Sequence, residues 1–151
     1  MTPENTQFLE LLDRRIGLLG SLAAALIAAR TDVVGFDLTG LETRIADQEH
    51  LCRDIRSLDV NIDRVQRRCA AQLGAAPDSV GAASHPDSLR MRETLGRLRE
   101  AHLSVKRLND VHQHLLRRSC LTVGALLNSY RTFAMTYSEP VSSRTSIGER
   151  A

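Results

Sequence analysis

The sequence predicts an all-α protein: a three-helix antiparallel bundle, or coiled-coil hairpin, with a long C-terminal helix and a disordered tail. Apolar residues recur in steps of three and four along most of the 151 residues, which is the helical period. Aromatic residues make up 3% of the chain and Trp is absent. Leu, Ala, Ile and Val therefore supply most of the apolar side chains, as in helix–helix seams. None of the four prolines lies between Pro3 and Pro77. We therefore expect a single helical domain over residues 1–137.

The first helix is expected over about residues 3–30. Thr2, Pro3 and Glu4 supply a capping hydroxyl, a proline at the first helical position and an acid in the first turn. Its apolar stripe consists of Phe8, Leu12, Leu19, Leu22, Leu26 and Ala29. Residues 31–32 and Gly35 indicate a break after the helix. That break is unusually apolar, and we expect it to plug one end of the bundle through Val33, Val34 and Phe36.

The second helix is expected over residues 37–73, beginning at Asp37 or at Thr39, where the spacing fits a capping box. Its seam alternates steps of four and three, as in a coiled coil. The seam residues are Leu51, Ile55, Leu58, Ile62, Val65 and Cys69. Gly74 stands where a C-terminal cap belongs, and a flexible loop rich in small and turn-forming residues follows over residues 74–86.

The third helix is expected over residues 86–137, followed by a polar, aperiodic tail over residues 138–151. At ~1.5 Å per residue the second and third helices would be roughly 54 and 75 Å long. If the two pair antiparallel from the loop, the third should outrun the second from near residue 123. Apolar surface left uncovered there would mark a partner site.

Two apolar stripes run along the later part of the third helix. The first continues the seam through Leu98, Ala101, Val105, Leu108, His112, Leu115, Ser119, Thr122, Leu126 and Phe133. The second comprises Leu116, Cys120, Val123, Leu127, Tyr130, Ala134 and Tyr137. Each stripe lies along one side of a helix, and one helix partner covers only one of them. The second stripe is therefore expected to face a partner. Ser119, Thr122 and Ser129 either bond to carbonyls one turn back or mark the change to a partner-facing surface.

Charge and composition disfavour several classes of partner. The 20 basic and 18 acidic residues are interspersed, so no strong field for nucleic acid or an acidic membrane is expected. A basic cluster consists of Lys106, Arg107, Arg117 and Arg118. We interpret it as a solvated face in preference to a docking site for an acidic partner. The longest apolar run, residues 16–29, is short for a membrane span, and the first residues lack the layout of a signal peptide. Three Cys at wide spacing fit a reducing cytoplasm.

Catalytic, metal and cofactor sites are not expected. The chain has no Glu-x-x-His pair, no Cys-x-x-Cys pair and no phosphate-binding glycine motif. Asp47 and His50 have ligand spacing, but a single pair is weak support for a metal. His112 lies at a seam position and is interpreted as a hydrogen-bonded core histidine. We therefore do not expect an enzyme.

Several segments in order resemble the FlgN-type flagellar export chaperones, over about residues 6–138. In the second helix the similar stretches are Asp37-Leu38-Thr39-Gly40-Leu41-Glu42 and Gln48-Glu49-His50-Leu51-Cys52. In the third helix they are Leu108-Asn109-Asp110-Val111-His112-Gln113-His114-Leu115-Leu116 and the closing Thr136-Tyr137. The chain departs from the family where Ser138-Glu139-Pro140 replaces a Gly near the closing Tyr, and where Asp110 and His112 replace an expected Asn.

The resemblance implies a cytoplasmic, non-enzymatic chaperone without cofactors. Such proteins bind C-terminal segments of the hook–filament junction proteins and deliver them to the cytoplasmic domain of the type III export gate. A client helix would lie along the second stripe, on Leu116, Cys120, Val123, Leu127 and Tyr130, in a helix-in-groove mode. Tyr137 is the candidate for gate docking.

Two alternatives stay open. The same stripe would serve a structural coiled-coil or helical-bundle subunit as an oligomer interface, including weak self-association. A helical adaptor outside the flagellar system is the other.

Overall fold

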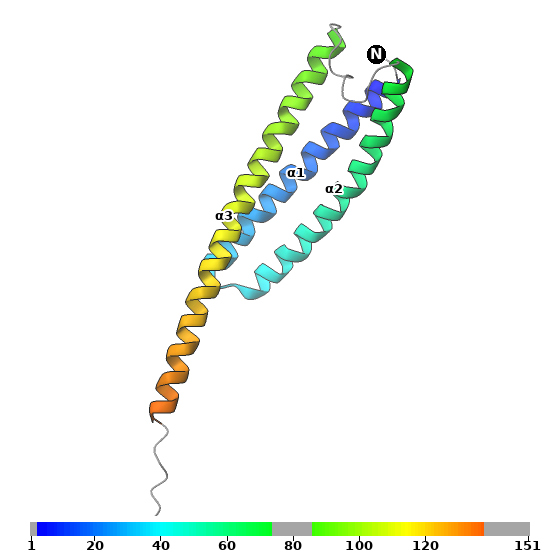
Figure 1. Cartoon of the computed structure of the whole chain (residues 1–151). Coiled ribbons are helices and arrows are strands. Elements are labelled where there is room, and N and C mark those ends of the chain that lie inside the picture. The colour runs from blue at the N-terminus through cyan, green and yellow to red at the C-terminus, as the bar shows by residue number, and fades with distance from the viewer. Residues whose placement is uncertain (1–2, 74–85, 138–151) are drawn as a thin grey trace, which may run out of the picture. The chain divides into compact units, whose positions relative to one another are not determined.

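Three long helices make up the described part of the chain, which covers residues 3–73 and 86–137 of a computed structural model (Figure 1). Helix α1 spans Pro3–Gly35, α2 spans Leu38–Leu73 and α3 spans Pro86–Tyr137. No strand occurs among these residues, and the predicted all-α fold is confirmed. The predicted loop at residues 74–86 and the predicted tail at residues 138–151 lie outside the described residues, except for Pro86, the first residue of α3.

The chain divides into two units, and α3 contributes to both. The first unit, Met1–Leu115, holds α1, α2 and the first part of α3, and the described part of the second is residues 116–137 of α3. In the first unit α2 runs antiparallel to α1, because Arg15 pairs with Asp59 at 2.7 Å and Asp32 lies beside Arg44. The part of α3 in this unit runs in the same direction as α1 (Figure 1), and its Arg97 pairs with Asp13 of α1 at 3.1 Å.

In the first unit, α1 contributes more buried apolar residues than α2 or α3 does. All six residues of the predicted α1 stripe are buried, and Leu9 and Val33 join them. The main cluster gathers apolar residues from all three helices: Phe8, Leu9, Leu12, Leu19, Val65, Cys69, Met91 and Leu98. The predicted α2 seam is also confirmed, since each of its six residues is buried or half-buried. Burial of such stripes, rather than intrinsic helix propensity, supplies most of the stability of helices in a bundle.

Helix α1 continues five residues beyond the predicted end, to Gly35, so the boundary at Arg30 was wrong. The added turn buries Val33, which favours the helical conformation there, and the Thr31 hydroxyl donates to the Ile27 carbonyl at 3.4 Å. The helix then closes on Phe36, which has φ of 55°. The amide of Phe36 donates to the Val33 carbonyl, and that of Asp37 to the Asp32 carbonyl, the two bonds of a Schellman motif.

The turn from α1 to α2 needs only two residues because Asp37 caps the next helix. Its carboxylate accepts a hydrogen bond from the amide of Gly40 at 2.9 Å, and its carbonyl accepts one from Leu41 at 3.0 Å. Asp37 is therefore the N-cap, and the alternative start at Thr39 was wrong. A Cβ at Gly40 would come within 3.2 Å of Asp32 and closer still to Asp37, so a glycine fits this turn.

The apolar residues at the end of α1 do not act together as a plug. Val33 is buried, as that prediction requires, but Val34 is exposed and Phe36 is 77% exposed. The prediction was therefore wrong for those two side chains. Val34 points to another side of the helix because it directly follows the buried Val33, and Phe36 lies beyond the end of α1 with a left-handed backbone.

Helix α1 is also long and apolar enough, by length and composition alone, to cross a membrane. Core helices of soluble proteins and signal sequences meet the same criterion, and α1 supplies eight buried residues to the first unit. The hydropathy of α1 therefore does not decide where the protein resides.

Candidate functional site

The burial of α3 changes sharply near residue 119. Up to that point the seam residues are buried or half-buried, from Leu98 through Leu115 to Ser119. From Cys120 onward every described side chain is exposed, Gly124 alone being intermediate. The exposed large apolar residues of this part of α3 are Leu121, Val123, Leu126, Leu127, Tyr130, Phe133 and Met135. Such a concentration on one helix is typical of an interaction surface.

Most of these residues fall on one side of α3. At about 100° per residue, the apolar positions project onto an arc about 140° wide. We call this arc the C-terminal apolar face, and it consists of Leu116, Cys120, Val123, Leu126, Leu127, Tyr130 and Phe133. Leu121 and Met135 lie outside it. The face combines residues from both predicted stripes.

The five predicted client-binding residues all belong to this face. Cys120, Val123, Leu127 and Tyr130 are exposed, and Leu116 is half-buried at its start. The first stripe differs from its prediction, because Thr122, Leu126 and Phe133 are exposed here rather than packed in a seam. The reason is that seam residues are covered only where a facing helix exists. Tyr137, predicted for gate docking, is the last residue of α3, and its side chain lies outside the described set.

Threonine hydroxyls in this half of α3 bond within the helix. Thr122 donates to the Arg118 carbonyl at 3.0 Å, Thr132 to the Asn128 carbonyl at 3.0 Å, and Thr136 to the Thr132 carbonyl. The predicted back-bonding is thus confirmed for Thr122. Because each hydroxyl is satisfied locally, these threonines require no polar partner outside the helix.

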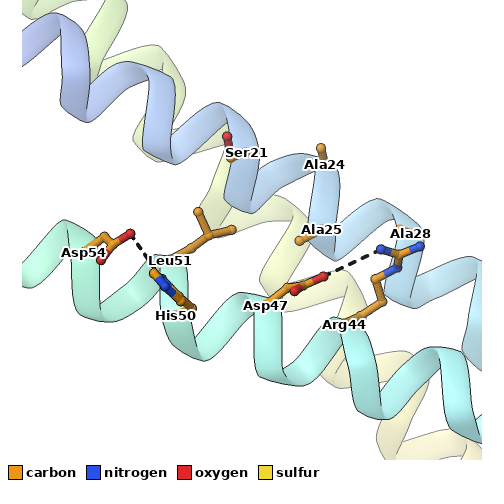
Figure 2. A pocket seen from close by; sticks show the side chains of 9 residues that line it. All are labelled: Ser21, Ala24, Ala25, Ala28, Arg44, Asp47, His50, Leu51 and Asp54. Atoms are coloured by element: carbon orange, nitrogen blue, oxygen red, sulfur yellow. Dashed lines mark ion pairs between the residues drawn. The ribbon is translucent and has the colours of Figure 1, made fainter.

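A second surface feature is a groove between α1 and α2, with a volume of about 590 Å³. The groove is lined by Ser21 and three alanines of α1 and by a row of charged residues on α2, and Figure 2 shows Ala25 pointing toward α2. Because the side chains on the α1 wall are small, they leave this space between the two helices unfilled. The groove lies entirely in the first unit.

The charged wall of this groove contains Asp47 and His50, the two residues with metal-ligand spacing. Asp47 lies 3.6 Å from the guanidinium of Arg44, whereas His50 pairs with Asp54 at 3.2 Å (Figure 2). The two side chains with ligand spacing are thus engaged with different neighbours. Among the described residues no three His, Cys, Asp or Glu side chains gather where they could hold a metal ion.

His112 is buried, with 6% of its surface exposed, as its seam position predicts. Its Nδ1 has no hydrogen-bond partner among the described residues, so the expected hydrogen bond is missing at that atom. Burial lowers the pKa of His112, because removing water disfavours the charged imidazolium.

The cysteines occupy three different environments. Cys52 is half-buried in α2, Cys69 is buried as its seam position predicts, and Cys120 is exposed on the C-terminal apolar face. Burial, and then the charge of Glu4, raise the pKa of the Cys69 thiol.

The basic cluster is exposed throughout, as the solvated-face interpretation predicts: Lys106, Arg107, Arg117 and Arg118 all face solvent. Sequence reasoning missed Arg131, which is exposed on the same part of α3. A helical projection of residues 116–137 would have placed it at the edge of the apolar face, next to Cys120 and Leu127.

The comparisons with known proteins supply no relative. No family model matches the chain, and neither curated proteins nor solved structures yield a match.

Proposed function

We propose that this protein is a cytoplasmic, non-enzymatic export chaperone of the FlgN type. It would bind amphipathic C-terminal helices of flagellar hook–filament junction proteins and deliver them to the type III export apparatus. The observation that carries the proposal is the C-terminal apolar face, which stays exposed on a helix whose earlier residues are buried. The resemblance of the helical segments to that family supplies the identity of the client.

A chaperone of this kind needs apolar surface that is available before the client arrives. Leu126, Leu127 and Tyr130 are each more than half exposed, and the hydroxyl of Thr122, one turn before Leu126, is satisfied within the helix. A client helix laid along the face would cover these side chains at spacings of three and four residues. The client's own assembly surface would be hidden in the same contact.

The test compares two leucines of the same helix. Leu127 lies on the C-terminal apolar face, and Leu121 lies about 120° away around the helix. Leu127→Glu should abolish binding of a junction-protein C-terminal segment, because burying a carboxylate in the contact is costly even when Arg131, four residues later, pairs with it, and a micromolar complex is only ~8 kcal/mol deep. Leu121→Glu is the matched control and should bind as the parent protein does. Both variants should keep the parent's helical circular dichroism and melting temperature.

Three results would contradict the proposal. Unfolding by Leu127→Glu would make that position part of a core. Equal loss of binding in both variants would mean that the contact is not confined to the apolar face. A stable oligomer that persists on dilution, and that Leu127→Glu dissociates, would favour the structural bundle subunit, which would use the same face permanently.

Delivery is assigned to Tyr137, the last residue of α3. Tyr137→Ala should leave client binding intact and reduce pull-down of the export gate's cytoplasmic domain. Loss of the client in this variant would show that binding and docking share one surface.

A further inference from the structure

The part of α3 that carries the C-terminal apolar face has charges of one sign only. Residues 111–137 contain Arg117, Arg118 and Arg131, all exposed, and no Asp or Glu. The chain as a whole is nearly balanced, with 20 basic and 18 acidic residues. Elsewhere the two signs pair with each other, as in Arg15–Asp59, but within the described residues none of these three arginines has an ion-pair partner.

Two of the three arginines line one edge of the face. Arg117 and Arg131 project within about 40° of each other, beside Cys120 and Leu127. They are two heptads apart, which is about 21 Å along the axis. Arg118 projects beyond the opposite edge, about 60° from Phe133, which equals the angle between Arg117 and Cys120, but no second arginine lies in line with it. The arrangement is therefore an apolar surface with two arginines in line along one side.

We propose that the occupant of this face is an amphipathic helix of another protein, whose apolar stripe is bordered on one side by acidic residues. Two carboxylates, themselves two heptads apart, would meet Arg117 and Arg131, because partner helices share the same rise per residue. Guanidinium and carboxylate groups form paired, charge-assisted hydrogen bonds, so the border sets the register and direction of the bound helix. This inference rests on the proposed function and specifies the chemistry of the client.

A second copy of the chain does not supply these charges. In an antiparallel pair centred on Gly124, the same edges meet, so Arg117 of one copy would face Arg131 of the other. In a parallel pair the basic edge would meet the edge that carries Ser119 and Ser129, which holds no carboxylate. Like charges placed together oppose association, so self-pairing is the poorer match.

A membrane surface is also a poorer match. Segments that bind anionic lipids usually carry four to eight basic residues, each worth about 1 kcal/mol. Residues 116–137 have three, one of which borders the opposite edge of the face, and the uncharged polar residues outside the face are Asn, Ser and Thr.

The experiment uses three synthetic helical peptides with one common apolar stripe and a border of Glu, Gln or Lys two heptads apart. Binding to the full chain is measured by fluorescence anisotropy at about 50 and 500 mM NaCl. The Glu peptide should bind about three- to tenfold more tightly than the Gln peptide at low salt, and the Lys peptide more weakly than both. The difference should shrink at high salt, because the Debye length falls to a few ångströms.

The charge-reversed protein supplies the second arm. Arg117→Glu/Arg131→Glu should invert the order and favour the Lys peptide, while the matched control Arg118→Glu should keep the order of the parent protein. Leu127→Glu should bind none of the peptides.

Each alternative outcome points to a different error. Equal binding of the Glu and Gln peptides, abolished by Leu127→Glu, would refute the acidic border and leave the chaperone proposal standing. No binding of any peptide would refute both. Binding to vesicles of anionic phospholipid but to no peptide, lost in Arg117→Glu/Arg131→Glu, would identify a membrane-surface helix and overturn the inference.

Discussion

Leu98 and Leu126 offer the sharpest test of where the core of α3 ends. Both are leucines of one helix, four heptads apart, so they occupy the same heptad position. Leu98 is 9% exposed and belongs to the main core cluster, whereas Leu126 is 65% exposed. The sequence pattern alone treats them as equivalent, and only the surroundings distinguish them.

The two alanine substitutions should therefore differ strongly in the free energy of unfolding. Leu98→Ala removes a buried side chain and leaves a cavity, which typically costs 2–5 kcal/mol, so about 3 kcal/mol is expected. At Leu126 only about a third of the side chain is covered, which limits the loss to below about 1 kcal/mol, and the better helix propensity of alanine offsets part of it. For a chain of this size, the melting temperature should fall by about 6–12 °C in the first variant and by less than about 3 °C in the second.

Thermal unfolding followed by circular dichroism, at two protein concentrations, measures both effects. Equal destabilisation by the two substitutions would refute the assignment of Leu126 to an exposed face. If the loss at Leu126 appeared only at the higher concentration, a second copy of the chain would be covering that residue. A neutral Leu98→Ala would contradict the core itself.

Three further predictions concern single groups. Asp37→Ala should cost about 1 kcal/mol by removing the N-cap of α2, whereas Asp37→Asn should be nearly neutral; urea unfolding distinguishes them, and equal losses would refute the capping role. The folded-state pKa of His112 lies below its unfolded value, so the unfolded state takes up a proton first, and stability should fall as the pH drops below about 6.5. His112→Gln should lose less stability than the parent between pH 7.5 and 5.5, and parallel curves would contradict this. Alkylation followed by mass spectrometry should modify Cys120 quickly and Cys69 only on unfolding, and early labelling of Cys69 would refute its burial.

The sequence was sufficient to predict the three helices and the two seams of the first unit, because the spacing of apolar residues indicates which side of each helix is buried. It failed at the end of α1. Gly35 indicated a break, yet the helix closes with Phe36 in the left-handed region, a conformation that a phenylalanine rarely adopts. Val33 is buried there and Asp37 caps the following helix, and the apolar pattern of residues 3–30 indicates neither feature.

The candidate site was predictable in part. The pattern located an excess of apolar residues after Leu116, and the expected loss of cover near residue 123 lies close to the observed change after Ser119. It could not show that Leu126 and Phe133 would be exposed along with the second stripe, because a seam residue and a partner-facing residue have the same spacing. Whether such a residue is covered depends on the extent of other helices.

The continuity of α3 through residue 119 has a consequence for how its exposed half stays helical. A separate peptide of residues 116–137 would have to form its own first turn, an unfavourable step with a nucleation constant of roughly 10⁻³. It also contains Gly124 and several β-branched and aromatic residues, which are poor helix formers. In the intact chain the buried turns before Ser119 already provide the nucleus, so each later residue joins by propagation alone. Among the exposed residues, amide hydrogen exchange should then be slowest next to Ser119 and become faster towards Tyr137. The buried half of the helix would thus stabilise the helical conformation of the exposed half.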